Sequence, residues 1–184
     1  MAQRIESSAD VVEFLLEQHN RIRQLFAETA AAAPEDREEK FVELRRLLAV
    51  HETAEEEIVH PRARRVIDHG KEIVDARLEE ENKAKHALAE LESIDVSSPE
   101  FTVKLAKLRD AVLNHAGNEE SEEFQQLRVK LDQSDLERMR RIVEFAEKTA
   151  PTRPHPGVES AAANMLVGPF ASMLDRARDA ISKP

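Results

Sequence analysis

Cysteine is absent from the 184 residues of this chain. Its absence excludes disulfide bonds, thiolate nucleophiles, cysteine-bound zinc and iron–sulfur clusters. Tyrosine and tryptophan are missing as well, so a tyrosyl radical has no carrier. Any redox reaction in this protein must therefore use a bound metal or another cofactor.

Glycine is scarce, with four residues, and the eight prolines fall mostly late in the chain. Charged residues make up 35% of the sequence, and Ala, Leu, Glu and Arg are abundant. This composition favours long helices over strands. The length suits one domain with appendages. We therefore predict an all-α protein.

The chain also lacks an apolar run long enough to span a bilayer, and residues 1–10 are too polar for a signal peptide. We expect a cytoplasmic protein without a membrane contact. The formal net charge is −10, and the basic residues are interleaved with acidic ones. Such a chain repels nucleic acid. Small molecules are the expected partners, bound by a monomer or a homodimer.

Apolar residues at three- and four-residue spacing predict four helices. The first begins at about Asp10, a good N-cap, and fades before Pro34. The second begins near Pro34, is interrupted at Pro61, and ends at Gly70 after a short continuation.

The third predicted helix covers roughly residues 71–94, and the fourth starts after Ser98 and Pro99. Short connections favour antiparallel neighbours. We therefore predict an up-down antiparallel four-helix bundle over residues 8–130.

Additional C-terminal helical segments are expected beyond the bundle. An additional helix is predicted in residues 131–150, followed by a Pro-rich linker at 151–157. Residues 158–184 are predicted to form an amphipathic tail. This tail either packs on the bundle or contacts a second copy or another partner.

Two motifs place an imidazole and a carboxylate one helical turn apart. They are His51 with Glu55, and His115 with Glu119. Two other histidines show the same offset to a glutamate, so spacing alone is weak support. The helix face that each residue occupies is the stronger criterion.

Seven residues are nearly two helical turns, so a residue with apolar neighbours at both seven-residue offsets shares their inward face. His19, His51 and Glu81 meet this criterion. His115 has Leu108 on one side and a glutamate on the other, but Val112 supports an inward position. Each helix thus directs one potential metal ligand towards the core.

Burying several carboxylates in an apolar bundle costs several kcal/mol, and no inward Lys or Arg is evident in the pattern. A multivalent cation resolves this conflict. Three imidazoles and three carboxylates without sulfur suit iron or manganese, and they are too many for one catalytic zinc. Two metal ions bridged by carboxylates fit best. The predicted ligands are His19, His51, Glu55, Glu81, His115 and Glu119.

Three segments resemble the hemerythrin HHE cation-binding domain over roughly residues 8–130. They are the region after His19, HETAEEEIVHP at 51–61 and HAGNEESEEF at 115–124. The resemblance implies a non-haem di-iron centre with oxo and carboxylate bridges, with manganese or zinc as weaker alternatives. By motif, its ligands map to His19, His51, Glu55, His115 and Glu119.

The sequence departs from the family pattern at two positions. Glu81 falls where a metal-binding histidine normally sits. His86 is the rival candidate, but its seven-residue neighbours are polar. His60 stands where many members carry an aromatic residue before Pro61. It is either a hydrogen-bond donor behind a ligand or simply a helix-end residue, and, like His86, it is a less favoured metal ligand than the six residues above. Apart from Glu119, the acidic run at 119–123 is interpreted as solvated helix surface.

A carboxylate in place of an imidazole adds negative charge, which stabilises an oxidised metal and disfavours reversible oxygen carriage. The resemblance includes a bacterial subgroup associated with peroxide decomposition. We therefore expect a di-iron protein that reacts with hydrogen peroxide or oxygen in a catalase-like manner. The alternatives are reversible binding or sensing of oxygen or nitric oxide, and iron homeostasis without turnover.

Overall fold

The computed structural model describes residues 10–150 and residue 152. Every regular element in residues 10–150 is a helix, which confirms the all-α prediction. None of these helices has an apolar stretch long enough to cross a bilayer. The predicted tail at 158–184 and the predicted linker, apart from residue 152, lie outside the described residues.

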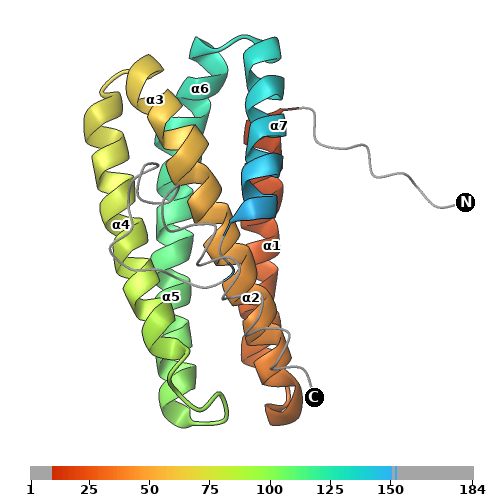
Figure 1. Ribbon diagram of the computed structural model, residues 1–184. Helices are drawn as coiled ribbons and strands as arrows, with labels where there is room; N and C mark the ends of the chain where they lie inside the picture. Colours follow the sequence, from red (N-terminus) through yellow and green to blue (C-terminus); the bar gives the residue numbers. More distant parts are fainter. Residues whose placement is uncertain (1–9, 151, 153–184) are drawn as a thin grey trace, which may run out of the picture.

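Four long helices run up and down as neighbours (Figure 1). Helix α1 packs against α2, α4 packs against α5, and α1 also contacts α5. The predicted bundle is therefore present. Its helices are α1 (Val11–Ala31), α2 (Pro34–Ala54), α4 (Gly70–Leu91) and α5 (Pro99–Asn118).

The helix starts follow ordinary capping chemistry. The Asp10 side chain accepts a hydrogen bond of 2.9 Å from the Glu13 amide, and Ser98 accepts one of 3.1 Å from the Phe101 amide. Pro34 and Pro99 occupy the first turns of α2 and α5, where a missing N–H has no cost. These starts agree with the sequence expectation.

The bundle interior contains two apolar clusters separated by a polar middle. One cluster includes Leu25, Phe41 and Phe101, and the rings of Phe41 and Phe101 meet edge to face at 5.0 Å. The other includes Leu15 and Phe124. Along each long helix, the buried histidines and glutamates lie between residues of the two clusters. The apolar clusters thus position polar side chains at mid-height.

Two π-helical segments interrupt the long helices, η1 (Glu55–Val59) and η2 (Glu119–Phe124). Helix α3 (His60–Val66) follows η1, and α6 (Gln125–Lys130) follows η2. The α-helix is interrupted by η1, just before the predicted point at Pro61, and Pro61 itself lies in the first turn of α3. The wider π turn just before Pro61 accommodates a ring that would clash with the preceding turn of a regular α-helix.

Each π segment shifts the buried face by one residue. Ile58 is only partly buried and Val59 is fully buried, although the seven-residue rule from His51 points to Ile58. Likewise Glu122 is exposed, whereas Glu123 is fully buried. Positions beyond a π segment therefore do not follow the α-helical period of the motif that precedes it.

Gly70 begins α4 and does not end the preceding helix as predicted, because α3 already stops at Val66. His69 has a left-handed φ of 54°. A Cβ at Gly70 would lie 2.7 Å from the carbonyl oxygen of Ala63 and 2.8 Å from that of Arg64. The turn therefore requires glycine because the two helices approach so closely.

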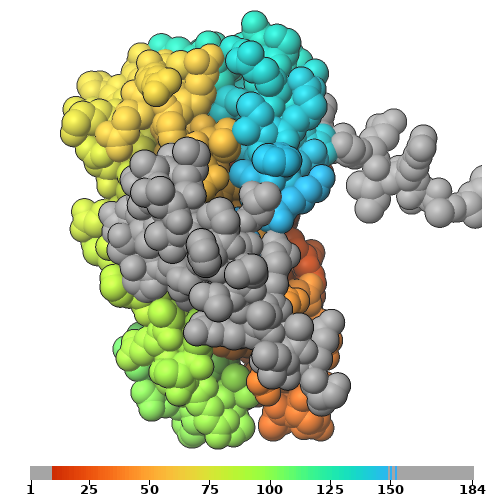
Figure 2. Space-filling view, viewed as in Figure 1, coloured from red at the N-terminus to blue at the C-terminus, as the bar shows by residue number. Residues whose placement is uncertain are grey.

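The predicted additional helix is α7 (Gln133–Thr149), capped by Asp132. It packs against α1, α2 and η1. Figure 2 shows the end of α7, in blue, directly beside the segment that joins α2 to α3. Its buried residues belong to the same apolar cluster as Leu15 and Phe124. Helix α7 is thus part of the packed domain.

Candidate metal centre

The six predicted ligands all lie in the polar middle of the bundle, and none is more than 7% exposed. They come from α1, from α2 with η1, from α4, and from α5 with η2. The residues are His19, His51, Glu55, Glu81, His115 and Glu119.

These residues form two overlapping groups of potential ligand atoms. In one group, His19 and His51 join Glu55 and Glu119, with one ligand atom per residue and all atoms within 4.8 Å of one another. In the other, Glu81 and His115 join the same two glutamates under the same limit. Two shared carboxylates between two donor groups are the arrangement that bridges a pair of cations.

The donor set fits a metal because its inward atoms are unsatisfied. Nε2 of His19 and of His115 has no hydrogen-bond partner among the described residues, and the same holds for both carboxylate oxygens of Glu55 and Glu119. Leaving such a buried group unpaired costs about 1–3 kcal/mol. Bound cations would satisfy these atoms together.

The outer nitrogens of the same imidazoles are hydrogen-bonded. Each Nδ1 has a side-chain oxygen as its partner, and an N–H donated there leaves the Nε2 lone pair facing the centre, as in metal-binding histidines. Sequence reasoning missed these partners. The pairs are His19 with Glu120 (2.8 Å), His51 with Gln18 (2.8 Å) and His115 with Glu80 (2.9 Å).

His60 also belongs to the centre. It is 1% exposed, and its Nε2 lies 2.5 Å from Glu81 Oε1 and 3.9 Å from Glu119 Oε1. Its Nδ1 lies 3.0 Å from Glu123 Oε1. His60 stands at the boundary of η1 and α3, and its contacts also agree with the interpretation as a hydrogen-bonding partner of a predicted ligand.

Glu123 is fully buried, and its Oε2 has no partner in the described part of the chain. The interpretation of residues 120–123 as solvated surface is therefore wrong for Glu123. Glu120 is partly buried as well, and it pairs with Arg23 at 2.7 Å. No spacing rule for an α-helix identifies Glu123, because the π segment displaces it inward.

On α4, Glu81 is fully buried within the donor group. His86 is exposed on the same helix, so the structure brings Glu81 and not His86 to the centre. Lys85 is buried too, contrary to the expectation of no inward Lys. It pairs with Glu56, which is outside the two donor groups.

The sequence matches the family described as the hemerythrin HHE cation binding domain over residues 10–127. The chain belongs to the hemerythrin HHE cation-binding domain family. Membership makes the buried centre that of a cation-binding domain, in agreement with its unsatisfied donor atoms.

Two individual proteins are similar to this HHE domain. A protein of Nostoc sp. (strain PCC 7120) named DNA nickase is 32% identical over 122 residues. That match covers 65% of this chain and 34% of the relative, so the chain spans about a third of that protein's length. A crystal structure of an HHE cation binding domain-containing protein from Mycobacterium kansasii superposes with a TM-score of 0.67 at 20% identity. It covers 76% of this chain and 85% of its own, and it shows the same fold.

The protonation of the HHE centre reflects its crowded charges. Burial, together with the nearby Glu119, raises the pKa of Glu55 well above its ordinary value. Burial opposes ionisation of Glu119, but His115 and His19 lower its pKa below the usual range. Carboxylates led by Glu119 raise the pKa of His115 to about 9, although burial opposes this. Without metal, the centre therefore holds protons that metal binding must release.

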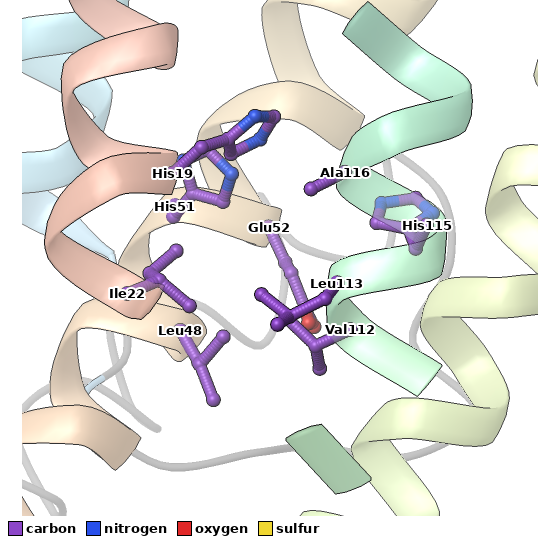
Figure 3. Close-up of a pocket in the computed structure, with 9 residues that line it drawn as sticks. All are labelled: His19, Ile22, Leu48, His51, Glu52, Val112, Leu113, His115 and Ala116. Carbon is purple, nitrogen blue, oxygen red and sulfur yellow. The ribbon is translucent and has the colours of Figure 1, made fainter. Parts of the chain in front are cut away.

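A small pocket adjoins the centre of the HHE domain (Figure 3). It touches His19, His51 and His115, and its other walls are mostly apolar. Glu52 adds a carboxyl group to the lining, and burial raises the pKa of Glu52 to about 8. The pocket volume of about 10 Å³ leaves room for about one water-sized molecule beside the imidazoles. Its remaining lining residues are Ile22, Leu48, Val112, Leu113 and Ala116.

Proposed function

We propose that this HHE domain holds two iron ions and reacts with hydrogen peroxide or oxygen, decomposing peroxide in a catalase-like manner. The observation that carries the proposal is the sharing of Glu55 and Glu119 between two buried donor groups. His19 and His51 would complete one metal position, and Glu81 and His115 the other. Nitrogen and oxygen donors without sulfur suit iron.

When bound, the iron pair supplies the electron transfer that peroxide decomposition requires. The protein residues supply orientation and a restricted environment. The oxygen partners of Nδ1 hold the imidazole rings of His19, His51 and His115. Apolar pocket walls limit the entry of water, and Glu52 offers a hydrogen-bonding group to a small polar molecule.

The charge of the donor set supports turnover over reversible oxygen carriage. Three carboxylates, those of Glu55, Glu81 and Glu119, belong to the two groups. Negative donors stabilise the oxidised form of a metal, which disfavours release of unchanged oxygen. This argument favours a reaction with peroxide.

Oxygen evolution from hydrogen peroxide tests the proposal. Iron-loaded protein should evolve oxygen faster than an equal amount of free iron, and a loaded His51→Ala variant should lose most of this rate. A rate no greater than that of free iron would remove the catalase-like activity. Absorption bands that appear with oxygen or nitric oxide and vanish on removal of the gas would replace it with reversible binding. A centre that ignores azide and peroxide would point to iron homeostasis.

The Nostoc relative's name makes DNA strand cleavage a second candidate function. The net charge of −10 opposes it, because the chain would repel the phosphate backbone. Iron-loaded protein should therefore leave supercoiled plasmid intact when peroxide is removed by added catalase. Nicking that requires protein-bound metal and tolerates catalase would favour this candidate over peroxide decomposition.

A further inference from the structure

His60 shares one feature with the three predicted histidine ligands, a side-chain oxygen at its outer nitrogen Nδ1. Its outer nitrogen Nδ1 meets a carboxylate oxygen, that of Glu123, at 3.0 Å. Its inner nitrogen Nε2 faces Glu81 at 2.5 Å and Glu119 at 3.9 Å. Among predicted ligands, His51 Nε2 also faces a carboxylate oxygen of the donor groups, Glu55 Oε2, at the longer distance of 3.2 Å.

The bundle has two halves with the same order of elements, one formed by α1, α2, η1 and α3 and the other by α4, α5, η2 and α6. His60 in the first half corresponds to Phe124 in the second. In each half, a histidine is followed four residues later by the glutamate that starts a π segment, Glu55 in η1 and Glu119 in η2. Nine residues after each histidine come His60 and Phe124, respectively.

Each of these two residues touches the potential ligand on the first helix of the other half. Phe124 stacks on His19, with ring centroids 5.6 Å apart and planes 18° from parallel. His60 contacts Glu81. In the first pair, the imidazole of His19 on α1 meets the aromatic ring of Phe124. In the second pair, the carboxylate of Glu81 on α4 meets the imidazole of His60.

The charges around His60 also call for a cation. The ring lies between the carboxylates of Glu81 and Glu123, and all three residues are buried. Both ring nitrogens therefore face carboxylate oxygens, and a metal ion at Nε2 would balance their negative charge. The second carboxylate oxygen of Glu81 and that of Glu123 have no hydrogen-bond partner in the part of the chain described. A cation at Nε2 therefore fits better than an isolated hydrogen-bonded triad.

We propose that His60 is a seventh metal ligand, which binds through Nε2 beside Glu81 and His115, and that Glu123 is the residue that positions its ring. This inference rests on the proposed metal pair. It gives each metal position two imidazoles, His19 and His51 at one, His60 and His115 at the other. The imidazole missing from α4 is thereby supplied by the helix that follows η1.

The number of coordinated imidazoles can be counted directly in the cobalt(II)-loaded protein. Each coordinated ring that keeps its Nδ1 proton gives one exchangeable proton signal, strongly shifted by the paramagnetic ion. The wild type should show four such signals, and His60→Phe, which copies Phe124, should show three. The exposed His86→Ala control should keep four. Three signals in the wild type, unchanged by His60→Phe, would overturn the inference.

Cobalt titration of the metal-free protein separates this inference from the proposed function. Failure of the wild type to bind a pair of ions would remove the function and the inference together. Two bound ions with three shifted signals would remove the inference alone. Circular dichroism of the metal-free His60→Phe variant checks its fold. If this variant does not fold, the signal count in the wild type still decides.

Glu123 is tested by a pair of substitutions. Glu123→Leu removes the acceptor at His60 Nδ1 and should weaken binding of one ion by roughly 10- to 100-fold, the usual effect of losing such a partner. Glu123→Gln retains an acceptor oxygen and should recover much of the affinity, with the His60 proton signal shifted and still present. Unchanged affinity and signals in Glu123→Leu would show that Glu123 does not position the ring.

Discussion

The imidazoles of the centre help to bind the proposed metal ions, and these ions would neutralise several buried carboxylates. His51→Ala should therefore lower the bound metal from two ions per chain and reduce stability by about 3–5 kcal/mol, because Glu55 and Glu119 lose their cation. Elemental analysis and thermal melting of the purified variant measure both effects.

His86→Ala is the matched control for this substitution, because His86 is exposed on α4. It should retain its metal and change stability by no more than about 0.5 kcal/mol. A metal-free His86→Ala protein would contradict the assignment of Glu81 as the ligand from this helix.

The sequence predicted the inward direction of single residues wherever the α-helical period holds. His19, His51 and Glu81 have apolar neighbours at both seven-residue offsets, and all three are buried. The same rule failed for His60 and Glu123. In a regular α-helix, nine residues amount to about 900°, which would place His60 on the face opposite His51. The extra residue taken up by η1 removes about 100° and turns His60 inward.

The π segments are the elements that sequence reasoning could not supply. Helix starts at Asp10 and Ser98 were predictable because their side chains cap local backbone amides. A π segment depends instead on whether each backbone amide bonds the carbonyl four or five residues earlier, and the spacing of apolar residues does not determine this. Both segments begin at a glutamate shared by the two donor groups, so the departure from α geometry coincides with the site.

Helix α7 reaches the centre through one hydrogen-bonded side chain. Gln18 accepts from His51 Nδ1 at 2.8 Å and donates from Nε2 to Glu147 at 2.6 Å. Glu147 thereby fixes which end of the Gln18 amide faces the imidazole. Glu147→Ala should weaken metal binding by up to about 10-fold, as measured by competition with a coloured chelator.

Glu144→Ala is the control on the same helix, because Glu144 pairs with Arg140 and not with Gln18. It should leave metal affinity unchanged. Equal affinities for the Glu147→Ala variant and the wild type would show that α7 contributes packing alone.

The molecule as a whole separates apolar packing at its two ends from charge at its middle. The sequence pattern predicted the bundle, because apolar residues at three- and four-residue spacing determine which helix faces pack. The number of protons held at the middle depends on burial and on contacts between helices, which the sequence alone does not contain. The metal-free domain should therefore show a pH dependence that composition cannot predict.

Above neutral pH, the metal-free protein should lose stability. Burial raises the pKa of Glu52 to about 8 and that of Glu56 to about 7, and carboxylates raise that of His115 to about 9 against the effect of burial. These groups hold more protons folded than unfolded between pH 7 and 9. Stability must then fall as pH rises, by about 1.4 kcal/mol per pH unit for each proton of difference.

The pKa values of His51, Glu81 and Glu119 are lowered from their ordinary values. These groups make stability rise with pH, but they do so below pH 7. A bound metal ion takes the place of the His115 proton, and its positive charge lowers the pKa of the nearby Glu52 and Glu56, so the loaded protein should be less sensitive to pH between pH 7 and 9. Urea denaturation at pH 7, 8 and 9, with a chelator or with bound metal, compares the two forms. Parallel pH profiles would mean that metal does not displace the His115 proton, against the assignment of His115 as a ligand.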